Sequence, residues 1–190
     1  ATRLVRAAFC YHMGADVLQN GVTPRLQTEM GGGALLDVGC YGVSVARWLM
    51  NAEPMRVQAQ ASCHPSGADW HLVGSLYFGP RRLAVVEASF ITALQQTYSV
   101  VGDCGAIDLP HDAFIPWEKD AGFVLRGRDE ETGTRQQIAG ADQYQLMVEH
   151  FADAVLGRSA LAYPPEESVA NMQVLDALSR AARSGRCEIV

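Results

Sequence analysis

The chain has 190 residues, 48% of them hydrophobic and 19% charged, so it has enough apolar surface for a packed core and should not be disordered. Its net charge of −6 at pH 7 argues against nucleic acid and anionic membranes as binding partners. The sequence contains no apolar run of about 18 residues, so it predicts no membrane-spanning helix.

The N-terminal third predicts a strand, a loop and a long helix. Leu4–Tyr11 is rich in Val, Phe and Tyr, which favours a strand. Gly14–Pro24 is polar and predicts a loop, with a turn at Asn20-Gly21. A triple glycine, Gly31–Gly33, then precedes Ala34–Met50, where apolar residues recur at helical spacing.

The middle of the chain predicts a series of consecutive strands separated by glycine-containing turns. These strands are expected over Met55–Cys63, His71–Phe78, Leu83–Ile91, Gln95–Val101, Ala106–Leu109, Phe123–Arg126 and Arg135–Ile138. In Met55–Cys63, apolar and polar residues alternate, which indicates one buried side and one solvated or partner-facing side.

Two helices are predicted near the C-terminus. Asp142 can cap the first, which runs to about Leu156, and Pro165 can begin the second, which Gly185 ends. An apolar stripe along the second helix predicts core packing; it consists of Val169, Met172, Leu175 and Leu178. Consecutive strands flanked by helices favour an antiparallel or mixed sheet with the helices on one face, which is an α+β fold.

The cysteines do not suggest a metal or a redox centre. The five cysteines form no C-x-x-C pair, which argues against a zinc knuckle or a thioredoxin-type site. Cys63, His64 and His71 fit no standard metal-ligand spacing, so no metal site is predicted. Reduced, mostly buried thiols are expected, and these fit a reducing compartment such as the cytoplasm.

The segment most suggestive of chemistry runs from Gly31 to Gly42. The triple glycine permits close backbone approach or positive φ, whereas Gly39 and Gly42 each cost a helix about 1 kcal/mol relative to Ala. That loss suggests close packing against another backbone or a ligand. Asp37 and Tyr41 are four residues apart, so a carboxylate and a phenol share one helix face.

The spacing of Asp37 and Tyr41 has two interpretations. In one, the two side chains converge on a substrate. In the other, the helix start simply carries a solvated Asp and a half-buried Tyr. Such pairs are common on helices, so the spacing alone names no reaction.

The segment G-G-G-A-L-L-D-V-G-C-Y, residues 31–41, resembles a signature of the glucose–fructose oxidoreductase/inositol dehydrogenase (Gfo/Idh/MocA) family, near the start of its C-terminal domain. The helix containing E-H-F, residues 149–151, and the terminal helix are similar in order to that family's later helices. The resemblance implies an open-faced, predominantly antiparallel sheet with helices on one face. It also implies that residues 1–190 are one C-terminal substrate-binding and oligomerisation domain, and that the family's N-terminal Rossmann domain is absent from this chain.

The resemblance further implies site residues and partners. The family's D-x-x-x-[HY] pattern falls on Asp37 and Tyr41, which are expected to be catalytic. Gly32, Gly33 and Arg25 are expected to bind substrate. The implied cofactor is NAD or NADP, held by the absent Rossmann domain with its Glu-Lys-Pro lysine. The implied substrate is a sugar, polyol or cyclic diol, and a homodimer or homotetramer is expected to form through the open sheet face.

These residue types suit hydride-transfer chemistry. A phenol has an ordinary pKa near 10, and a neighbouring lysine would lower it, so that Tyr41 could exchange the proton of a carbinol. Asp37 could hold that lysine or a substrate hydroxyl.

The chain contains no G-x-G-x-x-G after a strand and no Glu-Lys-Pro, so this piece alone is expected neither to bind NAD(P) nor to turn over substrate. Two alternatives remain: a non-catalytic ligand-binding or dimerisation module of the same fold, and a family member that has lost activity.

Overall fold

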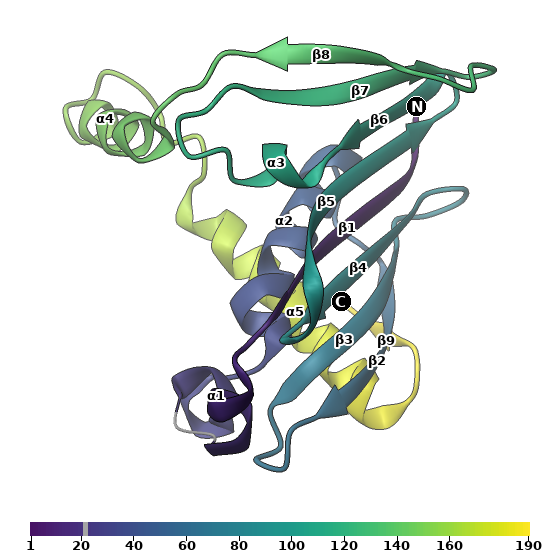
Figure 1. The fold of residues 1–190 in the computed structure, drawn as a ribbon, viewed down its shortest axis with the longest axis vertical. Coiled ribbons are helices and arrows are strands. Elements are labelled where there is room, and N and C mark those ends of the chain that lie inside the picture. The colour runs from purple at the N-terminus through teal and green to yellow at the C-terminus, as the bar shows by residue number, and fades with distance from the viewer. Residues whose placement is uncertain (21–22) are drawn as a thin grey trace.

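The computed structural model of the protein describes residues 1–20 and 23–190, with side chains at all of these positions except 112 and 113. Within this part of the chain, nine strands form one sheet in the order β8-β7-β6-β5-β1-β4-β3-β2-β9 (Figure 1). The strands are β1 Thr2–His12, β2 Arg56–Cys63, β3 Asp69–Tyr77, β4 Leu83–Ser89, β5 Ile91–Gly102, β6 Gly105–Leu109, β7 Ala121–Gly127, β8 Thr134–Ile138 and β9 Glu188–Ile189. Neighbouring strands are antiparallel, except that β1 and β4 pair in parallel. The expected α+β class with a predominantly antiparallel sheet is confirmed.

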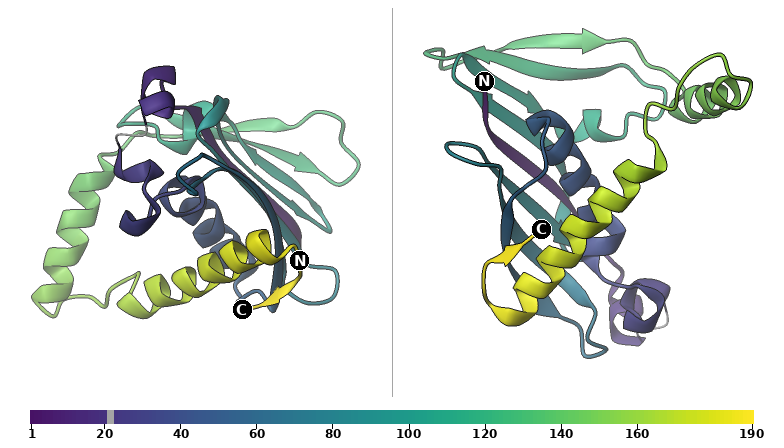
Figure 2. Two further views of the ribbon diagram at one scale, coloured as in Figure 1. Left: turned by 90° about the horizontal axis from the view of Figure 1, so that it is seen from below. Right: turned by 180° about the vertical axis from the view of Figure 1, so that it is seen from behind.

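Two long helical segments cover one face of this sheet. The helices are α1 Ala15–Asn20, α2 Cys40–Met50, α3 His111–Phe114, α4 Gln143–Val155 and α5 Pro165–Ser184, with short turns η1 Pro24–Leu26, η2 Thr28–Met30 and η3 Leu35–Gly39. Figure 2 shows α2 and α5 against the same face of the sheet. Arg82 on the β3–β4 turn donates a hydrogen bond to the Met50 carbonyl and so fastens the end of α2 to the sheet.

The main core lies between these two helices and strands β1 to β4. Val5 and Val86 from the sheet, Val43 from α2 and Leu178 from α5 are almost fully buried in one cluster. Each side chain comes from the helix-facing side of its element, because alternate residues of a strand point to opposite faces. Burial of these apolar groups is the main favourable contribution that holds the helical layer on the sheet.

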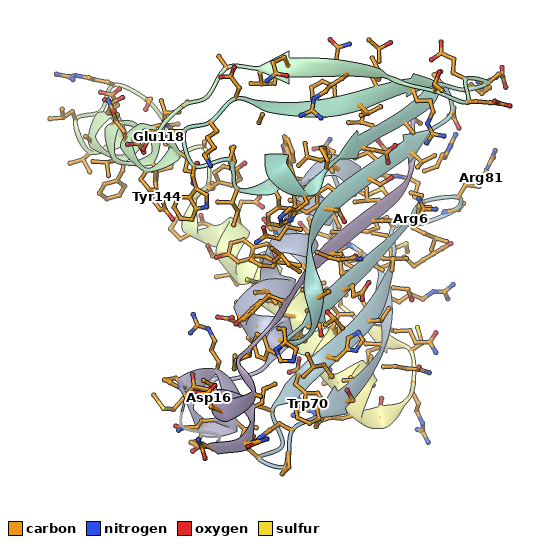
Figure 3. The ribbon with its side chains drawn as sticks, viewed as in Figure 1. Arg6, Asp16, Trp70, Arg81, Glu118 and Tyr144 are labelled. Atoms are coloured by element: carbon orange, nitrogen blue, oxygen red, sulfur yellow. The ribbon has the colours of Figure 1, made fainter. Side chains whose placement is uncertain are left out.

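A second, smaller cluster lies at the end of the sheet near α1. Phe90 and Leu26 are buried there, and Val17, Leu18 and Trp70 pack against them. Figure 3 labels Asp16 on α1 and Trp70 on β3 at this end of the molecule. The predicted loop over Gly14–Pro24 is therefore wrong in part, because apolar residues 17 and 18 allow Ala15–Asn20 to dock as a helix. The predicted turn at Asn20-Gly21 lies outside the described residues.

Other predicted elements differ in detail. The expected α-helix over Ala34–Met50 begins with the π-helical turn η3 before α2 continues it. The alternation in Met55–Cys63 produces burial only at Val57 and Ala59, because the far end of β2 extends beyond the helical layer. The short elements α3 and β9 were not predicted, since four and two residues are too few to show a periodic pattern.

The helix α4 has an apolar surface that is largely exposed in the described part of the chain. None of its 13 residues is buried, and exposed side chains include Tyr144, Leu146, Met147, Val148, Phe151 and Val155. Figure 2 shows α4 standing away from the sheet. The predicted stripe on α5 is divided in the same way: Leu175 and Leu178 are buried as expected, whereas Val169 and Met172 are exposed. No helix in the described residues is long and apolar enough to cross a membrane.

Candidate active site

The triple glycine, Gly31–Gly33, positions the start of η3. Gly33 has φ +128°, and a Cβ at this position would collide with the carboxylate of Asp69. That carboxylate accepts a hydrogen bond of 2.7 Å from the Leu35 backbone N–H, one of the donors left unpaired at a helix start. Burial raises the pKa of Asp69, while its backbone hydrogen bonds oppose the rise. Glycine at position 33 is therefore needed to let Asp69 cap the helix.

Close packing of η3 and α2 on the sheet explains the two interior glycines. A Cβ at Gly39 would lie 3.2 Å from the Ala88 Cβ, and one at Gly42 would lie 3.2 Å from the Ala7 Cβ. Both distances are shorter than ordinary carbon–carbon contacts. Gly39 and Gly42 thus let the helix approach β4 and β1, so the predicted close contact is with the sheet rather than with a ligand.

Asp37 lies at the centre of a small hydrogen-bonded cluster. The Arg25 Nε donates to both carboxylate oxygens at 3.0 Å, and the Tyr11 hydroxyl donates to Oδ2 at 3.4 Å. Burial is the largest cause that raises the pKa of Tyr11, followed by the charge of Asp37, so Tyr11 keeps its proton and acts as a donor. The carboxylate is fixed from the η1 side by Arg25 and from β1 by Tyr11.

An open hollow adjoins this cluster. Its volume is about 390 Å³, and Arg25, Gly32 and Asp37 line it together with Met30 and Leu36. A Cβ at Gly32 would lie 2.7 Å from the Pro24 and Gln27 carbonyl oxygens, so a larger residue would push the η1–η2 backbone away. The hollow presents a carboxylate, a guanidinium and backbone groups, which can hydrogen-bond the hydroxyls of a small polar ligand.

Tyr41 lies one turn further along, at the start of α2, with 53% of its surface exposed. Its ring contacts Phe9 at a centroid distance of 5.6 Å, and Phe9 in turn contacts Phe114 at 5.1 Å. Burial raises the pKa of Tyr41 most, followed by the charges of Cys40, Asp37 and Tyr144. Within this chain, Tyr41 is therefore a neutral phenol that can donate a proton or a hydrogen bond.

The structure brings together some of the predicted site residues. Arg25, Gly32 and Asp37 share the hollow, and Asp37 and Tyr41 are close enough to interact electrostatically. Gly33 is buried and faces Asp69, so its role toward a substrate stays a prediction. Tyr11 was missed, although it follows Val5, Ala7 and Phe9 at every second position of β1 and so points to the helical side.

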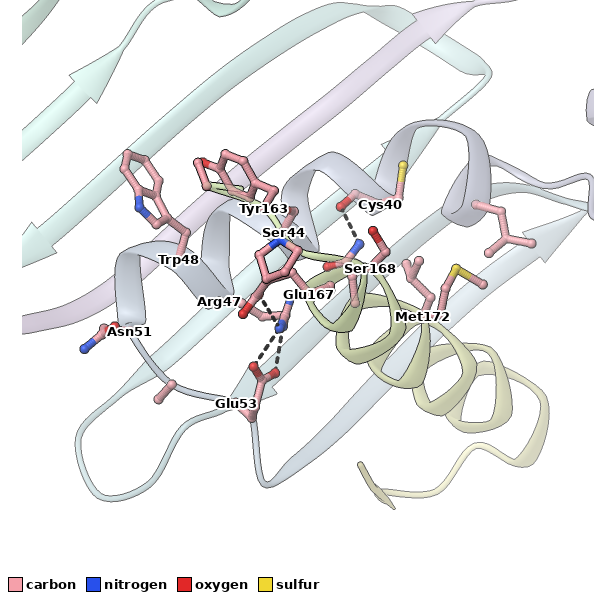
Figure 4. A pocket seen from close by; sticks show the side chains of 16 residues that line it. Cys40, Ser44, Arg47, Trp48, Asn51, Glu53, Tyr163, Glu167, Ser168 and Met172 are labelled. Carbon is pink, nitrogen blue, oxygen red and sulfur yellow. Dashed lines mark hydrogen bonds and ion pairs between the residues drawn. The ribbon is translucent and has the colours of Figure 1, made fainter. Parts of the chain in front are cut away.

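A larger hollow of about 730 Å³ lies between α2 and α5, but it does not contain Asp37 or Tyr41. Figure 4 shows Arg47 there, buried and bonded to Glu53 at 2.7 Å and to Glu167 at 3.0 Å. Two carboxylates already neutralise this guanidinium, and the Glu167 carbonyl accepts a further hydrogen bond from it. The ion pairs join the end of α2 to the start of α5, which is a structural role.

The described side chains include no group of three or more metal-ligating residues. His64, considered above as a ligand, has its Nε2 2.9 Å from the Leu18 carbonyl oxygen and its Nδ1 2.9 Å from the Ser66 hydroxyl. The contact with Leu18 attaches α1 to the β2–β3 turn, to which His64 and Ser66 both belong.

The chain is similar in sequence to several known proteins. The sequence model of one protein family, the GFO/IDH/MocA C-terminal domain, matches residues 1–108. D-xylose 1-dehydrogenase (NADP(+)) 2 of Haloferax volcanii is 32% identical over 162 residues, covering 85% of this chain and 49% of that protein. Trans-1,2-dihydrobenzene-1,2-diol dehydrogenase of Danio rerio is 36% identical over 115 residues, covering 60% of this chain and 33% of that protein.

Solved structures share the fold at lower identity. The 3-ketoreductase KijD10 from Actinomadura kijaniata, in complex with NADP and TDP-benzene, superposes with a TM-score of 0.81 at 20% identity, covering 95% of this chain and 54% of that one. The chain spans at most about half the length of the curated relatives it matches.

Proposed function

Because this chain belongs to the GFO/IDH/MocA family, we propose that it is the substrate-binding part of an NAD(P)-dependent oxidoreductase that transfers hydride between nicotinamide and a sugar, polyol or cyclic diol. The observation that carries the proposal is the Asp37 carboxylate, held by Arg25 and Tyr11, one helical turn from the exposed phenol of Tyr41. The names of the xylose and diol dehydrogenase relatives support this substrate class.

In this proposal Tyr41 exchanges a proton with the substrate. The reaction removes a hydroxyl proton from a carbinol during oxidation and returns it during reduction. Surroundings within this chain raise the pKa of Tyr41, chiefly through burial, so the neutral phenol suits the reductive direction. A cation from outside the chain, such as the lysine that the family resemblance implies, would lower that pKa and favour oxidation.

Asp37 and Arg25 orient the substrate in the adjoining hollow. The Asp37 carboxylate can accept a hydrogen bond from a substrate hydroxyl, and the Arg25 guanidinium can donate one. Because Arg25 and Tyr11 already hold Asp37, the acceptor is in place before substrate arrives. Preorganised polar groups of this kind lose little freedom on binding.

The residues of this chain do not by themselves fit a nicotinamide dinucleotide. A dinucleotide-binding fold needs parallel strands joined to a helix through a glycine fingerprint. In the described part of the chain, β1–β4 is the only parallel pair, and the sequence has no such fingerprint. We infer that a Rossmann domain outside these 190 residues holds NAD or NADP, which supplies the hydride chemistry when bound.

Two exposed apolar surfaces suit contacts with the partners expected in this proposal. The exposed apolar side of α4 and the exposed ring of Tyr41 suit coverage by that Rossmann domain. On the opposite, open face of the sheet, Val73, Leu83 and Val85 are exposed, which suits a homodimer or homotetramer through that face. All five cysteines are free thiols, which is consistent with a cytoplasmic enzyme. The expectation that they are mostly buried is wrong, because Cys63, Cys104 and Cys187 are exposed.

The test uses the full-length protein and follows NAD(P)H absorbance with a panel of aldoses, polyols and cyclic diols. Tyr41→Phe should lower kcat about 10²- to 10⁴-fold. Tyr163→Phe, which removes an exposed phenol from the α2–α5 groove, is the matched control and should leave kcat unchanged. Equal, measurable rates in wild type and Tyr41→Phe would refute the catalytic role of Tyr41. No turnover by wild type with any member of the panel would favour the alternative, a ligand-binding or dimerisation module without redox chemistry.

A further inference from the structure

The turn between α3 and β7 has an unusual backbone. Trp117 and Glu118 both have positive φ, +50° and +65°, and neither is glycine. L-residues disfavour this left-handed region because Cβ approaches the backbone, and two in succession persist only where the surroundings determine them. Backbones of this kind concentrate at sites of function, which makes the contacts of this turn informative.

Contacts on both sides of the turn hold it in this conformation. The Lys119 N–H donates to the Pro116 carbonyl at 3.1 Å and closes the turn. The Gly140 backbone packs directly on the Glu118 carbonyl, so that a Cβ at position 140 would collide with it. The Gly140 N–H also donates to Asp120 at 3.0 Å.

The segment that follows Gly140 connects this turn to the first turn of α4. Asp142 caps α4 by accepting hydrogen bonds from the Tyr144 and Gln145 backbone N–H groups at 2.9 and 3.0 Å. Figure 3 labels Glu118 and Tyr144 where the turn meets α4. The strained turn and the start of α4 therefore form one connected unit.

This unit presents two aromatic rings to solvent. The rings of Trp117 and Tyr144 lie with centroids 6.1 Å apart and planes 35° apart, and 61% and 56% of the two residues are exposed. Phe114 of α3, three residues before Trp117, contacts Phe9 at a centroid distance of 5.1 Å, and Phe9 contacts the Tyr41 ring at 5.6 Å. The charge of Tyr144 also contributes, after burial and the charges of Cys40 and Asp37, to the raised pKa of Tyr41. A row of ring contacts therefore runs from Tyr41 to α3, which directly precedes the turn that carries Trp117.

We propose that Trp117 and Tyr144 form a stacking wall that binds the C–H face of a cyclic substrate beside Tyr41. Flat aromatic rings remove such an apolar face from water, whereas the hydroxyls at the edge of the substrate ring remain free for Asp37 and Arg25. The inference rests on the proposed function and narrows it, because a stacking wall selects pyranoses and cyclic diols over open-chain polyols.

The experiment compares matched ligands in the full-length protein. The probes are D-xylose with xylitol, and trans-cyclohexane-1,2-diol with hexane-1,2-diol, each measured by calorimetry for Kd and by steady-state kinetics for KM and kcat. Trp117→Leu should weaken binding of the cyclic probes about three- to tenfold and change the open-chain probes less than about twofold. Trp117→Phe, which keeps an aromatic face, should recover most of the affinity.

Trp48→Leu is the control, because Trp48 is an equally exposed tryptophan (66%) on α2 that lines the other hollow. It should leave the preference for cyclic ligands unchanged. The inference is overturned if wild type shows no such preference, or if Trp117→Leu alters NAD(P)H binding or Tm without altering the preference, as expected of an interdomain contact. Weaker ring binding in Trp117→Leu combined with full activity in Tyr41→Phe would support the wall and refute the proposed catalytic role.

Discussion

Replacing Gly33 by Ala should destabilise the protein more than replacing Gly31 by Ala. At Gly33 the new methyl group meets the Asp69 carboxylate, and φ is +128°, a region that non-glycine residues rarely occupy. Strain of this kind costs about 1–3 kcal/mol. Displacing Asp69 also breaks its hydrogen bond to the Leu35 N–H and leaves that donor unpaired, at about 1–3 kcal/mol. The two contributions sum to about 2–6 kcal/mol.

Gly31→Ala is the matched control. Gly31 also has positive φ, +73°, but a Cβ there would meet only the Leu36 side chain at 4.0 Å. Only the left-handed backbone is then penalised, at about 1–2 kcal/mol. Urea unfolding followed by far-UV circular dichroism measures both variants. If Gly33→Ala costs no more than Gly31→Ala, the cap that Asp69 supplies to η3 does not require glycine at position 33, and our explanation of the start of this helix is wrong.

Three further outcomes are expected. Tyr11→Phe removes a donor to Asp37, so kcat/KM of the full-length enzyme should fall about three- to tenfold while the free energy of unfolding changes by about 1 kcal/mol or less; an unchanged kcat/KM would show that Tyr11 does not position the carboxylate. Glu53→Ala takes one of two carboxylates from the buried Arg47 and should cost about 2 kcal/mol in urea unfolding, whereas a cost near zero would mean that the α2–α5 ion pairs are dispensable. Hydrogen bonds from Arg3 lower the pKa of Asp103 to about 2, which an NMR titration of the Asp103 carboxyl can check. The contribution of Asp103 to stability is therefore present above the ordinary pKa of an aspartate and is lost as pH falls toward 2, and Asp103→Asn should lack this pH dependence.

The sequence predicted the sheet strands well because their signals are local. Alternating apolar residues and glycine turns mark most strand positions, and the long helix before Pro54 shows a clear 3.6-residue period. The π-helical turn over Leu35–Gly39 could not be predicted, because the apolar spacing there is the same as in an α-helix. The cap that Asp69 supplies to Leu35 could not be predicted either, because Asp69 belongs to the distant β3. The parallel pairing of β1 with β4 depends on tertiary packing in the same way.

The arrangement of the candidate site could be predicted in part for the same physical reason, while the roles of its residues stay predictions. Asp37 and Tyr41 could be paired from their spacing, and the resemblance pointed to Arg25, because those signals lie within one short segment. Tyr11 and Trp117 carry no motif, and their relation to Asp37 and Tyr144 exists only once β1, η3, the turn and α4 are folded together. The exposure of α4 was also hidden, since an apolar helix usually indicates core packing.

The central claim is that Tyr41 handles the proton of the reaction. It is tested most directly by the pH dependence of kcat for the full-length enzyme with its best cyclic substrate, in wild type and in Tyr41→Phe. In wild type, kcat should change with pH as the ionisation of one group predicts. The residual kcat of Tyr41→Phe should lack this pH-dependent change. The same pH profile in both proteins would contradict the claim.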